Sequence, residues 1–258
     1  MSRRVIGILL SVVSAACAGN RSGPRTAPND GLALLNQMHA AYAGKWFRTV
    51  TFTQLTTMYR PNGVTDTSTW YEAYRTPDRL RIDFGDPAKG NGVLYTAESL
   101  YVVREGKVTR TAAQGNPFLP FVGGIYTQPI DSTLKQLRPY NFDLSRLRDD
   151  MWENRPVYVV GSSAAGDTTS PQFWIEKERL LPVRVIVAFN PQTPADVGDI
   201  RLMDYRPVSG GWIAVKVDIM HGGRVVQKEE YSNWVGNVDL LPDFFVAEKW
   251  SAVPHWHR

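Results

Sequence analysis

One helical pattern near the N-terminal end of the chain is followed by segments that alternate between apolar and polar residues. From residue 32 onward, side chains of one stripe recur at spacings of three and four, which predicts an amphipathic helix; they are Leu32, Leu35, His39, Tyr42 and Trp46. Asn29 or Asp30 can cap the beginning of this helix, and Gly44 can end it. A helix with such a stripe needs a partner surface.

Short β-strands are predicted for most of the remaining chain. The clearest is RLRIDF at 79–84, in which charged and apolar residues alternate strictly. We expect the apolar set on a concave inner face and the charged set on the outer surface of the strand; the two sets are Leu80, Ile82 and Phe84, and Arg79, Arg81 and Asp83. Other segments of strand-like composition are 48–59, 69–75, 93–96, 100–104, 107–111, 157–161, 172–176, 182–189, 200–206, 212–220 and 224–234.

Two shorter helices are expected between the two groups of strands. Asp131 can cap the first, which carries Leu134 and Leu137 on one side, and the second is expected within 143–151. Because strands and helices do not alternate, we expect one antiparallel sheet and no parallel one. A sheet of about eleven strands twists and curls toward a barrel. The predicted fold is therefore mainly β, with a few helices covering the concave face.

The most apolar short run of the chain lies on the connection between the two groups of strands. Residues 115–126 read GNPFLPFVGGIY, and the prolines and the glycine pair disfavour both a long helix and a central strand. Connections are normally polar because they cross the surface. Such a run fits either a mobile cover over an apolar pocket, with Gly123 and Gly124 as a hinge, or a fixed plug of the core.

The first eighteen residues have the pattern of a secretory signal peptide. Arg3 and Arg4 precede an apolar run from Val5 to Val13, and small residues follow. The run is short for a helix that spans a bilayer. Residues 19–30, GNRSGPRTAPND, have the composition of a flexible tether, and 31–258 is expected to form a single domain.

Cys17 is the sole cysteine of the chain and lies where the signal would be cleaved. The stretch from Ser14 to Cys17 resembles the lipobox of bacterial lipoproteins, in which the cysteine becomes lipidated, although leucine is usual where this chain has Ser14. The alternative is ordinary cleavage after Ala18. In either case the mature chain has no disulfide, so its stability depends on a hydrophobic core.

Charge and motifs argue against several other classes of protein. The formal net charge is +4, removal of Arg3 and Arg4 lowers it to +2, and no dense basic stripe suggests nucleic-acid binding. His221 before Gly222 and Gly223 is typical of a hairpin turn, since no nucleophile motif accompanies it. We therefore predict neither an enzyme nor a cofactor.

A metal site is not predicted either. His255 and His257 have no third nearby histidine or cysteine and are interpreted as a frayed tail. Glu229 and Glu230, like Asp149 and Asp150, are interpreted as solvated positions.

The order of several short motifs resembles the LolA/LolB-like outer-membrane lipoprotein-sorting superfamily, over roughly residues 31–246. After the expected helix come Phe52-Thr53-Gln54, then 74–81 (YRTPDRLR), 93–96 (VLYT) with 100–103 (LYVV), 115–118 (GNPF), and finally Asn237 and Phe244-Phe245. One position departs from the family pattern. Thr76 stands before Pro77 where soluble carriers have a basic residue, and Arg75, one position earlier, should point to the opposite face.

The resemblance implies an unclosed barrel with helices in its mouth and an apolar cavity for acyl chains between them. The run at 115–126 falls where the family has its cavity cover. The residues implied in lipid binding, on the cavity walls and the cover, are Phe52, Leu80, Ile82, Phe84, Phe118, Leu119, Phe121, Ile125, Leu134 and Leu137.

Two functions follow from the resemblance. The first is a lipid or lipoprotein carrier or receptor in the bacterial periplasm, which reaches the outer membrane through a lipid anchor if Cys17 is acylated. The second is an envelope protein-interaction or sensor module that has the same fold and a filled interior.

Overall fold

The computed structural model describes residues 26–257. The predicted signal peptide, Cys17 and most of the predicted tether lie outside these residues. Within the tether, Thr26 accepts a hydrogen bond from Gln37 and Pro28 is buried, so its last residues contact the domain. No helix in the part described is long and apolar enough to cross a membrane.

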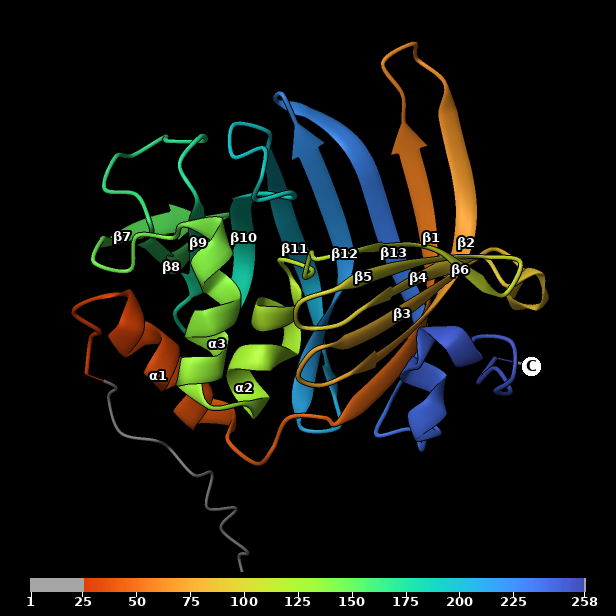
Figure 1. The fold of residues 1–258 in the computed structure, drawn as a ribbon. Coiled ribbons are helices and arrows are strands. Elements are labelled where there is room, and N and C mark those ends of the chain that lie inside the picture. The colour runs from red at the N-terminus through yellow and green to blue at the C-terminus, as the bar shows by residue number, and fades with distance from the viewer. Residues whose placement is uncertain (1–25, 258) are drawn as a thin grey trace, which may run out of the picture.

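Thirteen antiparallel strands form one sheet that does not close (Figure 1). The strands are β1 (Thr49–Tyr59), β2 (Thr65–Arg75), β3 (Arg79–Phe84), β4 (Gly92–Tyr95), β5 (Leu100–Arg104), β6 (Lys107–Ala112), β7 (Leu147–Trp152), β8 (Arg155–Val160), β9 (Gln172–Glu176), β10 (Leu181–Ala188), β11 (Val197–Val208), β12 (Gly211–His221) and β13 (Arg224–Gly236). Their spatial order is β6-β5-β4-β3-β2-β1-β13-β12-β11-β10-β9-β8-β7. The chain thus makes two meanders joined where β1 pairs with β13, and the predicted fold class is confirmed.

Helix α1 (Gly31–Tyr42) begins at Asp30, whose carboxylate accepts a hydrogen bond from the backbone N–H of Ala33 at 2.7 Å. Leu34, Leu35 and Met38 form its buried side. Leu32 is 41% exposed, so the predicted stripe was slightly rotated from the true one.

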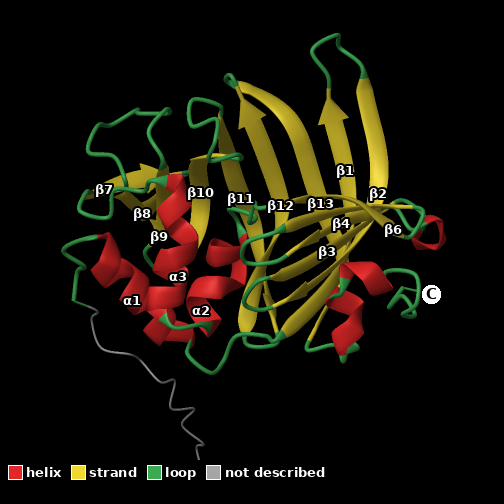
Figure 2. Cartoon of the chain, viewed as in Figure 1, coloured by secondary structure: helices red, strands yellow, loops and turns green. Residues whose placement is uncertain are grey.

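The connection from β6 to β7 supplies the other helices of the concave side. It contains a π-helical turn, η2 (Pro120–Gly124), then α2 (Ile125–Thr127), α3 (Ile130–Leu137) and a 3-10 turn, η3 (Arg138–Tyr140). Figure 2 shows α1, α2 and α3 gathered over one half of the sheet. Their apolar side chains join the main core cluster with residues of β9 and β10.

The helix predicted within 143–151 was wrong, because this segment contains the edge strand β7. Asp143 accepts hydrogen bonds from the backbone of Ser145 and from the side chain of Arg146, which forms a tight turn. Beyond it, Arg148 and Asp150 are charged residues of the kind that protect a sheet edge from pairing with another chain.

The C-terminal segment packs on the outer face of the first meander, so the frayed tail predicted there was wrong. Its two 3-10 turns are η4 (Pro242–Phe245) and η5 (Ala247–Lys249), and a further 3-10 turn, η1 (Pro87–Lys89), lies between β3 and β4. Phe244, Phe245 and Trp250 form a second core cluster with Ala73, Leu94 and Val103 of the sheet. Arg75 lies beneath this segment, with its guanidinium 4.6 Å from the centre of the Phe245 ring. Its side chain therefore points to the outer face, opposite to the cover, as predicted.

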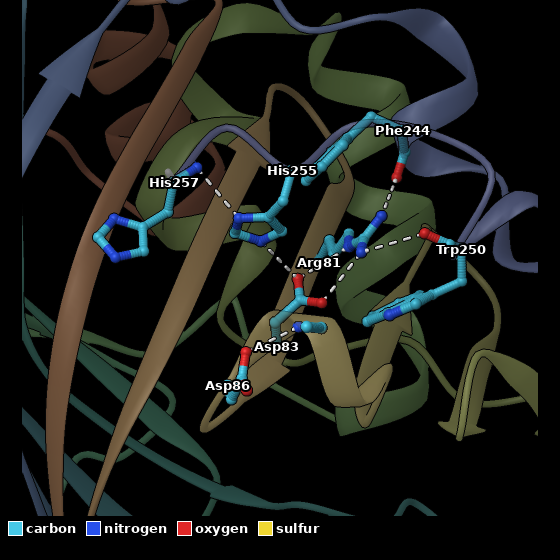
Figure 3. A network of polar contacts seen from close by, with 8 residues as sticks. Arg81, Asp83, Asp86, Phe244, Trp250, His255 and His257 are labelled. Atoms are coloured by element: carbon cyan, nitrogen blue, oxygen red, sulfur yellow. Dashed lines mark hydrogen bonds and ion pairs between the residues drawn. The ribbon is translucent and has the colours of Figure 1, made fainter.

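A network of charged groups lies under the same segment (Figure 3). Arg81 donates to both carboxylate oxygens of Asp83 at 2.8 and 2.9 Å, and His255 lies 3.1 Å from Asp83. Arg81 also donates to the backbone oxygens of Phe244 and Trp250 and stacks on both rings. Both charged residues are almost fully buried, so their predicted place on an exposed strand surface was wrong.

Candidate functional site: a divided cavity on the concave face

The floor of the site is formed by neighbouring strands whose inward side chains are set by strand alternation. On β1 the inward residues include Phe52 and Gln54, which pair across the ladder with Glu72 on β2 and with Tyr231 on β13. Phe52 stacks on Tyr231 with ring centres 4.5 Å apart. Aromatic and polar side chains therefore share one floor.

A wide cavity of about 330 Å³ lies over β3, β4, β12 and β13. Its volume is at the lower end of the range of small-molecule sites. Apolar and aromatic residues form much of its wall, and the cover contributes Pro117 and Phe118; the other large apolar members are Trp70, Leu80, Ile82, Phe84, Val93, Tyr95, Phe189, Ile200, Val217 and Ile219.

A narrow cavity of about 100 Å³ adjoins the wide one toward α2. Glu72, Leu80 and Tyr231 line both cavities, so the two are neighbours across these side chains. The rest of the wall of the narrow cavity is almost entirely apolar and includes Phe52, Leu119, Phe121, Tyr126 and Trp212.

The cover over these cavities is residues 115–126. Phe121 is buried against Phe142 and Phe173, with ring centres 5.7 and 5.0 Å away. By contrast, Phe118 is half-buried and meets Phe189 with ring centres 6.0 Å apart. The cover is therefore packed firmly at η2 and less firmly at its N-terminal end.

Gly123 belongs to the firmly packed part of the cover. A Cβ atom at Gly123 would lie 2.3 Å from the hydroxyl oxygen of Tyr74, which itself donates a hydrogen bond to the backbone of Pro77 at 2.8 Å. The glycine therefore permits a close approach between the cover and β2. A π-helical turn at such a place is frequent at functional sites.

The residues predicted from the sequence to bind lipid fall into three groups. Phe52, Leu119 and Phe121 line the narrow cavity, Ile82, Phe84 and Phe118 line the wide one, and Leu80 lines both. Ile125, near the C-terminal end of the cover, and Leu137 are buried in the core, and Leu134 packs against that core.

Sequence reasoning missed the polar groups on the cavity floor. Glu229 was predicted to be solvated, which was wrong, because it lines the wide cavity and accepts hydrogen bonds from Tyr231 and Gln227. Glu72 was not singled out, although it alternates with Trp70 and Tyr74 along one face of its strand. A carboxylate between two inward aromatic residues is the signal that could have identified the site.

The two carboxyl groups are held in an environment that disfavours their charge. Burial, and then the charge of Glu229, raises the pKa of Glu72 well above its ordinary value. Burial also raises the pKa of Glu229, although the hydrogen bonds from Tyr231 and Gln227 act in the opposite direction. The cavity thus favours protonated, uncharged carboxyl groups when nothing cationic is near them.

Comparison with known proteins gives matches of structure only. No protein-family model matches the sequence, and no curated protein matches it. A DUF1329 family protein from Desulfovibrio piger has 13% identity and a TM-score of 0.56, with 83% of this chain and 95% of that chain covered.

Two further solved structures are similar to the same degree. A putative outer membrane lipoprotein-sorting protein domain from Vibrio parahaemolyticus has 12% identity and a TM-score of 0.55, with 85% of this chain and 97% of that chain covered. A LolA superfamily protein from Nitrosomonas europaea has 11% identity and a TM-score of 0.53, with 84% and 97% covered. At such identities the likeness concerns the fold, and on this evidence the chain has a LolA-like fold.

Proposed function

We propose that this protein binds lipids or lipoproteins in the bacterial cell envelope and holds their acyl chains in the divided cavity. The observation that carries the proposal is the hollow itself, which lies between the sheet and an apolar cover and has mostly apolar walls. An apolar chain placed there would remove both its own surface and the cavity walls from water. The proposal assigns no catalytic step to the chain.

The N-terminal sequence supports an envelope location. Arg3 and Arg4, the apolar run that follows them and the small residues before Cys17 have the pattern of an export signal. Acylation of Cys17 would anchor the protein to a membrane, whereas cleavage after Ala18 would release it. The intact mass of protein purified from its native membrane distinguishes the two, since a chain that begins at Gly19 without added acyl mass excludes the anchor.

The binding proposal is tested by organic extraction of the purified protein followed by mass spectrometry, and by titration with a fluorescent fatty-acyl probe. Ile219→Trp would place an indole in the wide cavity and should weaken probe binding at least tenfold while leaving the fold intact. Val235→Trp is the matched control, because Val235 is 55% exposed on the neighbouring strand β13. Unchanged binding in Ile219→Trp would contradict a ligand in the wide cavity.

A second candidate function is a protein-interaction module with a closed interior. It is favoured by the half of the fold near β9 and β10, where Ile125, Leu137 and Phe173 are buried in a continuous core. If no apolar probe binds and extraction yields no lipid, this second function is the better account of the fold.

A further inference from the structure

The Glu72 carboxyl is the least expected group in the cavity. It is 4% exposed, lines both the wide and the narrow cavity, and lies where the two meet. Within residues 26–257 no hydrogen-bond donor and no cation contacts this carboxyl. An unpaired carboxylate in such a place is costly, so a structural role does not explain it.

The surroundings of Glu72 lack positive charge. Neither cavity is lined by a lysine, arginine or histidine among the described residues, although the whole chain carries a net charge of +4. The titratable groups on the wide cavity besides Glu72 are Glu229, Tyr95 and Tyr231. An anionic head group placed there would therefore meet acidic side chains and no compensating cation on the cavity wall.

Several features of the same cavity suit a cation. Glu229 lies on β13, on the other side of β1 from Glu72, and is already held in place by Tyr231 and Gln227. Trp70 and Phe84, with ring centres 4.6 Å apart, present aromatic surface at the wall. Aromatic rings and carboxylates are the two kinds of group that bind ammonium ions in proteins.

We propose that the cavity selects amphiphiles with a primary ammonium head, which Glu72 binds while the alkyl or acyl chain lies along the apolar walls. The narrow cavity, which begins at Glu72 and is otherwise almost entirely apolar, provides a place for the chain next to the head. This inference rests on the proposed lipid-binding function and specifies the chemical class of the ligand. It makes Glu72 the specificity-determining residue and Glu229 a second acceptor.

Three ligands with one chain length test the inference: dodecylamine, dodecanol and dodecanoate, titrated calorimetrically into the protein near neutral pH, each below the concentration at which it forms micelles or separates from solution. Dodecylamine, cationic under these conditions, should bind at least tenfold more tightly than dodecanol, and dodecanoate should bind most weakly. Because burial in the empty cavity raises the pKa of both carboxyl groups, binding of the ammonium should also release protons, which is measured as a dependence of the heat on the buffer.

The isosteric variant Glu72→Gln should abolish the preference for dodecylamine and leave dodecanol binding unchanged. Glu229→Gln should reduce the preference and provides a second variant. Glu230→Gln, the next residue on the same strand and exposed, is the matched control and should bind as the unmodified protein does.

The possible outcomes distinguish a failure of ammonium selection from a failure of the proposed lipid-binding function. Equal binding of dodecylamine and dodecanol, or tighter binding of dodecanoate, overturns ammonium selection but leaves lipid binding in place. A preference that survives in Glu72→Gln overturns the assignment of Glu72. Failure of all three ligands to bind overturns the proposed function itself.

Discussion

Buried ionisable side chains lie on both faces of the first meander, but their surroundings differ between the two faces. On the outer face, Arg81 and Asp83 form a bidentate pair, and the C-terminal segment supplies His255 and two backbone oxygens. On the concave face, Glu72 has no such partner among the described residues. The buried ionisable groups thus belong to the packing on the outer face and line a cavity on the concave face.

The comparison shows that the burial of an ionisable side chain does not reveal whether that side chain has polar partners. Arg81 and Glu72 are 2% and 4% exposed, yet only the first is surrounded by groups that satisfy its charge. A satisfied group contributes to the uniqueness of the fold, whereas an unsatisfied one lowers stability unless something binds it. We therefore expect substitutions on the two faces to have effects of different size and opposite sign.

The largest effect on stability is expected from breaking the network of Arg81, Asp83 and His255 on the outer face. Asp83→Ala leaves Arg81 buried without its carboxylate and should destabilise the fold by about 3–5 kcal/mol, measured by urea denaturation. Asp66→Ala is the control, because its partner Arg60 is largely exposed, and should cost less than about 1 kcal/mol. Similar losses in both variants would mean that the C-terminal segment does not hold the network closed.

A smaller loss is expected where the cover meets the concave face. Gly123→Ala would place a methyl group against the hydroxyl of Tyr74 and should cost about 1–3 kcal/mol. Gly124→Ala is the comparison: its Cβ would lie 3.0 Å from the side-chain nitrogen of Gln128 and 3.1 Å from the backbone oxygen of Leu119, and we expect a smaller loss than in Gly123→Ala. Equal tolerance in urea denaturation would mean that the cover shifts freely, as a mobile lid would.

The smallest effect, and the one of opposite sign, is expected at the cavity floor. The pKa of Glu72 is raised above its ordinary value of 4.5, so above that value the folded state binds more protons than the unfolded state. The contribution of Glu72 is therefore fully present at low pH and is lost as the pH rises through the raised pKa. Glu72→Gln removes this loss, and its melting temperature should exceed that of the unmodified protein near pH 8.

The temperature difference should shrink toward pH 5, because a lower pH favours the protonated form of the unmodified carboxyl, which resembles the amide. A gain of 1 kcal/mol corresponds to roughly 2–4 °C for a domain of this size. Glu230→Gln should show no such dependence, because Glu230 is exposed. A difference that is the same at both pH values would contradict the raised pKa.

The sequence predicted the fold well because the relevant signals are local. Alternation along 79–84 correctly separated Leu80, Ile82 and Phe84 from the charged residues, since side chains on a strand point to opposite faces in turn. The same pattern could not show that Arg81 is buried. Arg81 is buried by Phe244, Trp250 and His255, which lie far from it along the chain. The residues of β3 alone do not indicate this contact.

The candidate site was predictable only in its apolar part. Seven of the ten residues singled out from the sequence line a cavity, because the resemblance located the cover and alternation located the walls. Glu229 was misjudged because glutamates are mostly exposed, and composition alone does not reveal an inward position. Its inward position follows from the register that pairs it with Thr56 of β1 and Val217 of β12, which depends on long-range strand pairing.

The route of the chain between β6 and β7 has a mechanical consequence. These strands are the two free edges of the sheet, and residues 113–146, which carry the cover, join one edge to the other. Outward movement of the cover is therefore coupled to the distance between the edges. The stiffness of the sheet opposes such movement, and the irregularity in the β1–β13 pairing between Thr51 and Thr53 is a point where the sheet bends more easily. The two edges of the sheet are thus tied together through the cover as well as through the strands between them.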